Sequence, residues 1–104
     1  MNSQPTIYIY PGAIEVSTTP VIFSTILGSC VSVCLWDTKL KIAGINHFML
    51  PLWNGEGLES PRYGNVAIEK LINIMLRKGS NIEDIYAKVF GGGNIIESSS
   101  NLYR

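Results

Sequence analysis

Hydrophobic positions along the chain fall into short runs that are separated by turn residues. The runs are rich in β-branched and aromatic residues, and glycine, proline or small polar residues bound them. This pattern predicts strands over residues 7–10, 13–16, 30–36, 41–50 and 86–90. Residues 21–27 are apolar with two hydroxyl side chains among them, so they could form either a strand or a loop.

One segment instead has the periodicity of a helix and follows a polar, glycine-containing loop over residues 52–62. Its apolar residues recur at i, i+3, i+4 and i+7, as Ile68, Leu71, Ile72 and Met75. The pattern predicts a helix over 63–78, and Gly79 is suited to end it in a left-handed conformation. Runs of strands with a single helix between them indicate an α+β fold rather than a regular alternation.

Composition narrows the class of protein. We expect a single domain over residues 1–104, with enough apolar residues, 46% of the chain, to build a core. Eight basic and eight acidic residues are scattered, so the net charge is zero and no basic patch indicates nucleic-acid binding. No apolar run approaches the roughly 18 residues that would span a bilayer, and the N-terminus lacks a signal-peptide pattern. We therefore expect a cytoplasmic protein without direct membrane insertion, with reduced thiols.

Two cysteines lie in the segment LGSCVSVCLWD, and the strand pattern gives them different roles. In a strand over residues 30–36 they share one face, with Cα atoms about 13 Å apart at about 3.3 Å per residue. A disulfide needs Cα atoms within about 7 Å, so the pair cannot bridge within that strand. Cys34 is interpreted as a small buried residue. Cys30 follows the turn at Gly28 and Ser29, where backbone N–H groups can stabilise a thiolate or an oxyanion.

His47, the only histidine of the chain, lies on the strand predicted to pair with the Cys30 strand through a turn at 37–39. In such a hairpin the two residues are nearly opposite each other, on strands about 4.8 Å apart. A thiol beside an imidazole is the arrangement of cysteine hydrolases. The alternative is a buried histidine, flanked by Ile45 and Phe48, whose ring is satisfied by a backbone carbonyl.

A third group usually orients the histidine of such a dyad. Ser24, Thr25 and Asp37 are available, but Asp37 is better explained as a turn residue. Ser24 and Thr25 lie in an apolar segment where a hydroxyl needs a partner, so either could take this role. The glycine run 91–93 lacks the spacing of a phosphate-binding loop, and the cysteines and histidine are poorly placed for zinc. We expect neither a cofactor nor a metal.

Several motifs, in the same order, resemble the CheD family of chemoreceptor glutamine deamidases. They are LGSCVSVCLWD, GINHFMLP, the helix RYGNVAIEKLINIMLRKG and AKVFGGGN, and the resemblance runs from about Ile14 to Glu97. It implies a three-layer α/β/β sandwich, similar to that of deamidating toxins. It also implies a protein-glutamine glutaminase that hydrolyses receptor glutamines to glutamate and releases ammonia.

The resemblance assigns roles to individual residues of the site. By it, Cys30 is the nucleophile and His47 is the general base and acid. Our hypothesis for the mechanism adds that backbone amides near residues 28–30 hold the oxyanion, with Gly28, Ser29 and Thr25 lining the site. The family has a threonine six positions before its cysteine. Ser24 stands there in this chain, and the neighbouring Thr25 could substitute for it.

Partners also follow from the resemblance. The substrates would be helices of methyl-accepting chemoreceptors, and a CheC-type phosphatase would bind at the glycine-rich turn through Gly92, Gly93, Ile95 and Ile96. Family members continue well past residue 104, so we expect this chain to be incomplete at its C-terminus. The alternatives are a non-catalytic adaptor that docks on receptors or on a CheC-like partner and, less favoured, a thiol redox sensor at Cys30.

Overall fold

The computed structural model describes residues 4–49 and 59–91. Within this part of the chain, the strands are β1 (Thr6–Tyr8), β2 (Ile14–Ser17), β3 (Ile22–Ser24), β4 (Val31–Asp37), β5 (Ile42–Asn46) and β6 (Ile85–Gly91). The helices are α1 (Gly64–Arg77) and the single 3₁₀ turn η1 (Ile82–Asp84). The predicted α+β class is therefore confirmed, and the segment 21–27 contains a short strand followed by a loop.

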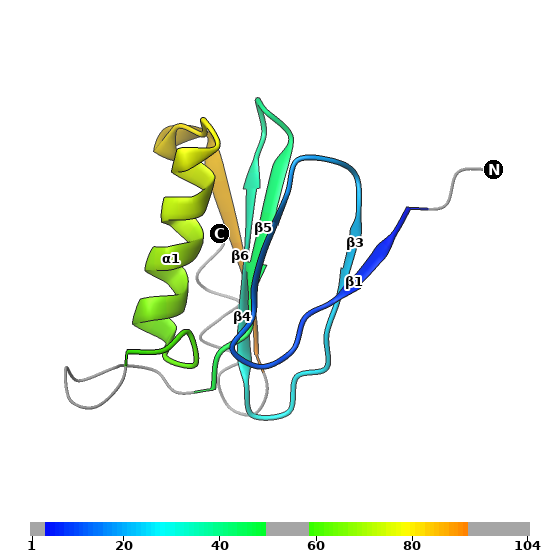
Figure 1. Ribbon diagram of the computed structural model, residues 1–104, viewed down its shortest axis with the longest axis vertical. Helices are drawn as coiled ribbons and strands as arrows, with labels where there is room; N and C mark the ends of the chain where they lie inside the picture. Colours follow the sequence, from blue (N-terminus) through cyan, green and yellow to red (C-terminus); the bar gives the residue numbers. More distant parts are fainter. Residues whose placement is uncertain (1–3, 50–58, 92–104) are drawn as a thin grey trace.

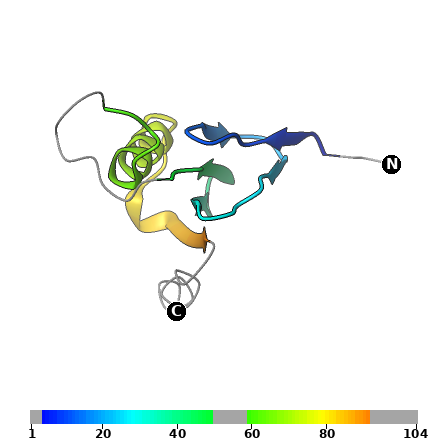
Figure 2. The same cartoon turned by 90° about the horizontal axis from the view of Figure 1, so that it is seen from below.

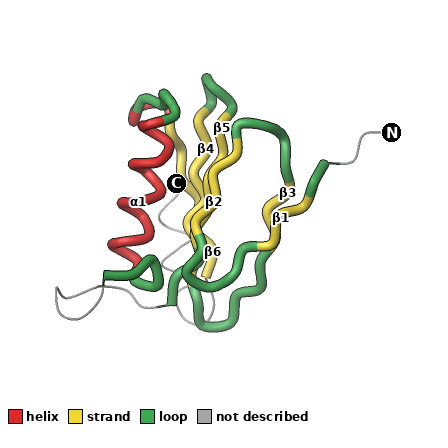
Figure 3. Tube along the Cα trace, in the orientation of Figure 1, coloured by secondary structure: helices red, strands yellow, loops and turns green. Residues whose placement is uncertain are grey.

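The strands form two sheets on one side of the helix. Four of them make an antiparallel sheet in the order β2-β5-β4-β6, while β1 and β3 pair in parallel as a separate two-stranded sheet. Figure 1 shows α1 against one side of the four-stranded sheet and β1 with β3 beyond its other side, and the view from below in Figure 2 agrees. The tube in Figure 3 separates these elements by type.

The hydrophobic core lies between α1 and the four-stranded sheet. The fully buried positions of the helix are Ala67, Leu71 and Met75, which pack with Val33, Leu35, Ile42 and Phe48. The predicted stripe is correct in its orientation, although Ile68 and Ile72 are only partly buried at its edge. The helix approaches the sheet closely at Gly44, because a Cβ atom there would lie 2.6 Å from Cδ1 of Leu71.

The end of α1 is fixed by a Schellman motif, as Gly79 led us to expect. Gly79 has a φ of 107°, and its N–H donates to the carbonyl of Leu76 at 3.0 Å. The N–H of Ser80 donates to the carbonyl of Met75 at 3.1 Å. These two bonds satisfy carbonyl groups that the last turn leaves open, so the helix stops within one residue of its predicted end.

The turn between β4 and β5 is longer than predicted, and this changes the register of the hairpin. Asp37 pairs with Ile42, so the turn occupies residues 38–41 instead of 37–39. Oδ1 of Asp37 accepts the N–H groups of Lys39 at 2.8 Å and Leu40 at 2.9 Å, which confirms its interpretation as a turn residue. The extra residues move the partner strand along, so Cys34 pairs with Ile45.

Strand β5 is shorter than the predicted run of residues 41–50, part of which lies outside the described residues. It ends at Asn46, and pairing with β4 resumes only at the isolated bridge between Val31 and Phe48. That bridge keeps the same offset as the pair of Cys34 and Ile45. Ser32 is therefore opposite His47, and Cys30 is opposite Met49. The expectation that Cys30 and His47 are nearly opposite is wrong by two residues: they are diagonal neighbours.

Candidate functional site

His47 lies just after β5, where it is held from two directions. Its side chain is 2% exposed, and its own carbonyl accepts the N–H of Gly12 at 2.7 Å. Its Nδ1 lies 2.9 Å from Oγ1 of Thr25 and 3.4 Å from the carbonyl oxygen of Ile9. The loop after β3 and the segment after β1 thus both reach the same imidazole. They join the two-stranded sheet to the end of β5.

The hydrogen-bond network assigns the proton on this ring. The hydroxyl of Thr25 has one hydrogen, which it donates to the carbonyl of Ile9 at 2.7 Å. Toward His47 the Thr25 oxygen can therefore only accept, so Nδ1 carries a hydrogen. In the neutral ring Nε2 then has the free lone pair, and among the described residues Nε2 has no hydrogen-bond partner. In this tautomer the buried Nε2 is the ring atom that can accept a proton.

The hydroxyl that contacts His47 belongs to Thr25 and not to Ser24. Alternation along β3 and the residues after it turns Phe23 and Thr25 toward the four-stranded sheet, while Ser24 is exposed. The carbonyl of Ser24 accepts the N–H of Ile9, so its backbone supports the sheet without placing its side chain at the ring. Of the two hydroxyl residues that the sequence left open, the one that contacts His47 is Thr25, and Ser24, which stands at the family's threonine position, does not.

Cys30 is half-buried, has a free thiol and immediately precedes β4. The next residue, Val31, exchanges both backbone hydrogen bonds with Phe48, at 2.9 and 2.8 Å, which fixes this end of the hairpin. Diagonal neighbours on one sheet face have Cα atoms about 7–8 Å apart, within reach of an imidazole. Nε2 has no hydrogen-bond partner among residues 4–49 and 59–91, so the described structure shows no hydrogen bond between the ring and the Cys30 thiol. Apo hydrolase sites often have such open geometry.

The residues before Cys30 form an exposed bend. Gly28 and Ser29 are both exposed, and a Cβ atom built at Gly28 would meet no heavy atom within 4 Å. Open space on this side leaves the backbone N–H groups near Cys30 accessible to a bound group. The bend that was predicted to hold an oxyanion is therefore open on this side.

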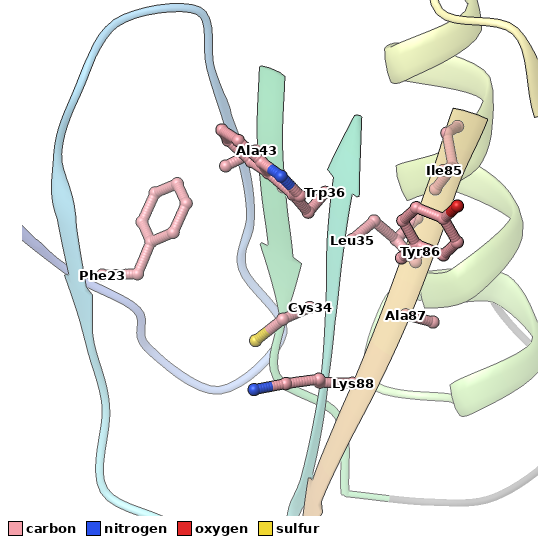
Figure 4. Close-up of a pocket in the computed structure, with 10 residues that line it drawn as sticks. Phe23, Cys34, Leu35, Trp36, Ala43, Ile85, Tyr86, Ala87 and Lys88 are labelled. Atoms are coloured by element: carbon pink, nitrogen blue, oxygen red, sulfur yellow. The ribbon is translucent and has the colours of Figure 1, made fainter. Parts of the chain in front are cut away.

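Cys34 lies on the opposite side of the sheet from the helix and is only half-buried, so its interpretation as a core residue is wrong in degree. It lines a cavity of about 830 Å³, together with Phe23, Trp36 and Lys88 among other residues. Figure 4 shows the Cys34 sulfur and the Lys88 nitrogen pointing to the side of the sheet where Phe23 lies. Burial raises the pKa of the Cys34 thiol, and a side-chain hydrogen bond with Ser32 and the charge of Lys88 oppose this rise. Cys34 is therefore a poor nucleophile at neutral pH.

Two buried polar residues next to the site were missed by the sequence reasoning. Ser32 is 1% exposed and Asn46 is fully buried. Oγ of Ser32 donates to the carbonyl of Asn46, and Oδ1 of Asn46 accepts the N–H of Val33 at 2.8 Å. The available signal was an amide at an inward position of an apolar strand, because a buried polar group needs a partner.

The predicted binding site for a CheC-type partner lies outside the described residues. It consists of Gly92, Gly93, Ile95 and Ile96. Within the described part of the chain, no helix is long and apolar enough to cross a membrane.

Comparison with known proteins gives consistent matches. A family model described as "CheD chemotactic sensory transduction" matches residues 49–103. A protein of Trichlorobacter lovleyi is 50% identical over 93 residues, which cover 89% of this chain and 58% of that protein. One from Sulfurimonas denitrificans is 51% identical over 87 residues, covering 84% of this chain and 56% of that protein. One from Rhodopseudomonas palustris is 46% identical over 99 residues, which cover 90% of this chain and 46% of that protein.

All three relatives are named "Probable chemoreceptor glutamine deamidase CheD". The chain spans about half the length of these curated relatives.

Proposed function

The chain belongs to the CheD family, and on that premise we propose that it carries the catalytic residues of a chemoreceptor glutamine deamidase. The reaction converts glutamine side chains of methyl-accepting chemoreceptors to glutamate and releases ammonia. The observation that carries the proposal is the state of His47. Thr25 fixes its Nδ1–H, and its buried Nε2 has no hydrogen-bond partner among residues 4–49 and 59–91.

The first half of the reaction forms a thioester. Nε2 of His47 takes the proton of the Cys30 thiol, and Sγ attacks Cδ of the substrate glutamine. The resulting oxyanion is held by backbone N–H groups around Gly28, Ser29 and Cys30, in the open bend before β4. The tetrahedral intermediate collapses as the C–N bond breaks. The leaving nitrogen takes the proton from Nε2 and departs as ammonia.

The second half regenerates the thiol. Nε2 removes a proton from water, whose oxygen attacks the thioester carbon, and the same N–H groups hold the second oxyanion. The C–S bond then breaks and the proton returns from Nε2 to Sγ, leaving a glutamate side chain. Thr25 keeps the ring oriented throughout, since the Nδ1–H donates to its hydroxyl oxygen in both the neutral and the protonated ring.

The finer parts of the fold and the partners are proposed on the same family basis. The layers of helix, four-stranded sheet and two-stranded sheet are consistent with an α/β/β sandwich. Receptor helices are the proposed substrates, and a CheC-type phosphatase is a proposed partner of residues 92–96. A cytoplasmic location would keep both cysteines reduced, as the mechanism requires of Cys30.

Mass spectrometry of a receptor peptide tests the proposed function. The full-length protein should convert one or more glutamines to glutamate, seen as the mass gain for replacing an amide by a carboxylic acid. A matched peptide with asparagine at the modified positions should stay unchanged. A receptor fragment that binds the folded protein but gains no mass would contradict the enzyme and support the adaptor alternative.

A further inference from the structure

The hydrogen-bond ladder between β4 and β5 is interrupted beside the site. In an antiparallel pair, residues that exchange both backbone bonds recur every second position. Val31 and Phe48 make such an exchange, so Val33 and Asn46 should make the next one. There, however, the N–H of Val33 donates at 2.8 Å to the side-chain oxygen of Asn46 instead of its carbonyl.

The displaced carbonyl of Asn46 accepts the hydroxyl of Ser32. This carbonyl belongs to the planar peptide group that joins Asn46 to His47. Its direction therefore fixes the orientation of that peptide plane and of the His47 N–Cα bond. The following peptide group is fixed as well, because the carbonyl of His47 accepts the N–H of Gly12 at 2.7 Å. The carbonyl groups of both peptides that flank the His47 Cα atom are thus held by bonds outside the regular β4–β5 ladder.

We infer that Asn46 is a positioning residue for His47, an inference that rests on the proposed function. Its side-chain oxygen takes the place of the backbone carbonyl in the ladder, and the turned peptide directs the imidazole toward Thr25. Without that oxygen, the buried N–H of Val33 would need the backbone carbonyl of position 46, as in a regular ladder. The peptide would then rotate, and Nδ1 of His47 would move away from Oγ1 of Thr25.

The two polar atoms of the Asn46 side chain differ in their hydrogen bonds, and within the described part of the chain only the oxygen has a partner. Nδ2 is buried and has no hydrogen-bond partner among the described residues, whereas Oδ1 has one. An aspartate at this position would keep every hydrogen bond seen here, and an alanine would lose the bond to Val33. The two substitutions therefore separate the acceptor oxygen from the rest of the amide.

The experiment compares Asn46→Ala, Asn46→Asp and the parent as full-length proteins. Asn46→Ala should lower kcat for receptor deamidation by about tenfold or more with KM little changed, because small displacements of a catalytic group are costly. Asn46→Asp should recover most of that loss. In ¹⁵N NMR, the parent should show His47 protonated at Nδ1, and Asn46→Ala should lose this single tautomer. A through-hydrogen-bond coupling in the parent should join the Val33 amide to the Asn46 side-chain carbonyl.

Three results would overturn the inference. One is a folded Asn46→Ala protein with the kcat and the His47 tautomer of the parent. Another is a folded Asn46→Asp protein as impaired as Asn46→Ala. The third is a Val33 coupling to the backbone carbonyl of Asn46 in the parent, which decides the matter even if Asn46→Ala does not fold. If the parent itself releases no ammonia, the proposed function fails, whereas the two NMR measurements still test the positioning of His47.

Discussion

Replacing Cys30 by alanine is expected to abolish ammonia release from receptor glutamines, with a loss of about a thousandfold or more. In the proposed mechanism the variant removes the sulfur atom that forms the thioester, and His47 alone cannot replace it. Cys30 is half-buried at the start of β4, and alanine fills less space there, so the fold should persist. The measurement is ammonia release from a receptor fragment, with circular dichroism to confirm folding.

Cys34→Ala is the matched control for this substitution. Cys34 is also half-buried and lies within β4, the strand that Cys30 immediately precedes, but burial raises the pKa of its thiol and it has no imidazole partner in the described contacts. Its replacement should leave deamidation close to the parent rate. Equal losses in the two variants, with folding preserved, would contradict the assignment of Cys30 as nucleophile.

The second large effect is expected at Thr25. Thr25→Val keeps the shape of the side chain and removes the hydroxyl that joins Nδ1 of His47 to the carbonyl of Ile9. The ring would then be free to rotate or to move its proton, and kcat should fall by about 10- to 100-fold. Steady-state kinetics of deamidation would measure the loss, which should appear in kcat more than in KM.

Two further variants separate the hydroxyl from its neighbours. Thr25→Ser retains the hydroxyl and should recover much of the activity, whereas Ser24→Ala should resemble the parent because the Ser24 side chain is exposed. A large loss in Ser24→Ala with a mild effect of Thr25→Val would reverse the roles of the two residues. Ser24, which stands where the family has a threonine, would then be the residue that orients His47.

The sequence was most informative where local pattern and tertiary structure agree. The helix was predicted within one residue at each end, because its apolar stripe and Gly79 act locally. The expectation that Cys30 and Cys34 do not form a disulfide followed from the rise per residue of a strand, and both are free thiols. Local patterns of this kind require no knowledge of what packs against them.

Register and side-chain contacts were less accessible because they depend on other segments. The length of the turn after Asp37 moved His47 by two positions relative to Cys30, and a short turn motif does not fix that length. The choice between Ser24 and Thr25 depended on which face of β3 meets the four-stranded sheet. The proposed role of Asn46 could not be predicted, because it depends on the Val33 N–H donating to the side-chain oxygen of Asn46 and not to its backbone carbonyl.

Burial on the sheet face away from the helix was also misjudged. The strand pattern treated Cys34 as core, yet it lines a cavity of about 830 Å³, and Trp36 beside it is 42% exposed. Apolar residues on a strand show that a face can be covered, but they do not show how closely the next layer packs. Here, in the part of the chain that the structure describes, Phe23 of β3 reaches toward that face without filling it.

The pairing of Cys30 with His47 is tested most directly by the rate at which iodoacetamide alkylates each cysteine of the full-length protein. Peptide mapping by mass spectrometry follows the two sites in the parent and in His47→Ala. Cys30 should react much faster than Cys34 in the parent, because the imidazole takes its proton, and this advantage should disappear in His47→Ala. Equal rates at the two cysteines of the parent, or a fast Cys30 that is indifferent to the loss of His47, would contradict the dyad.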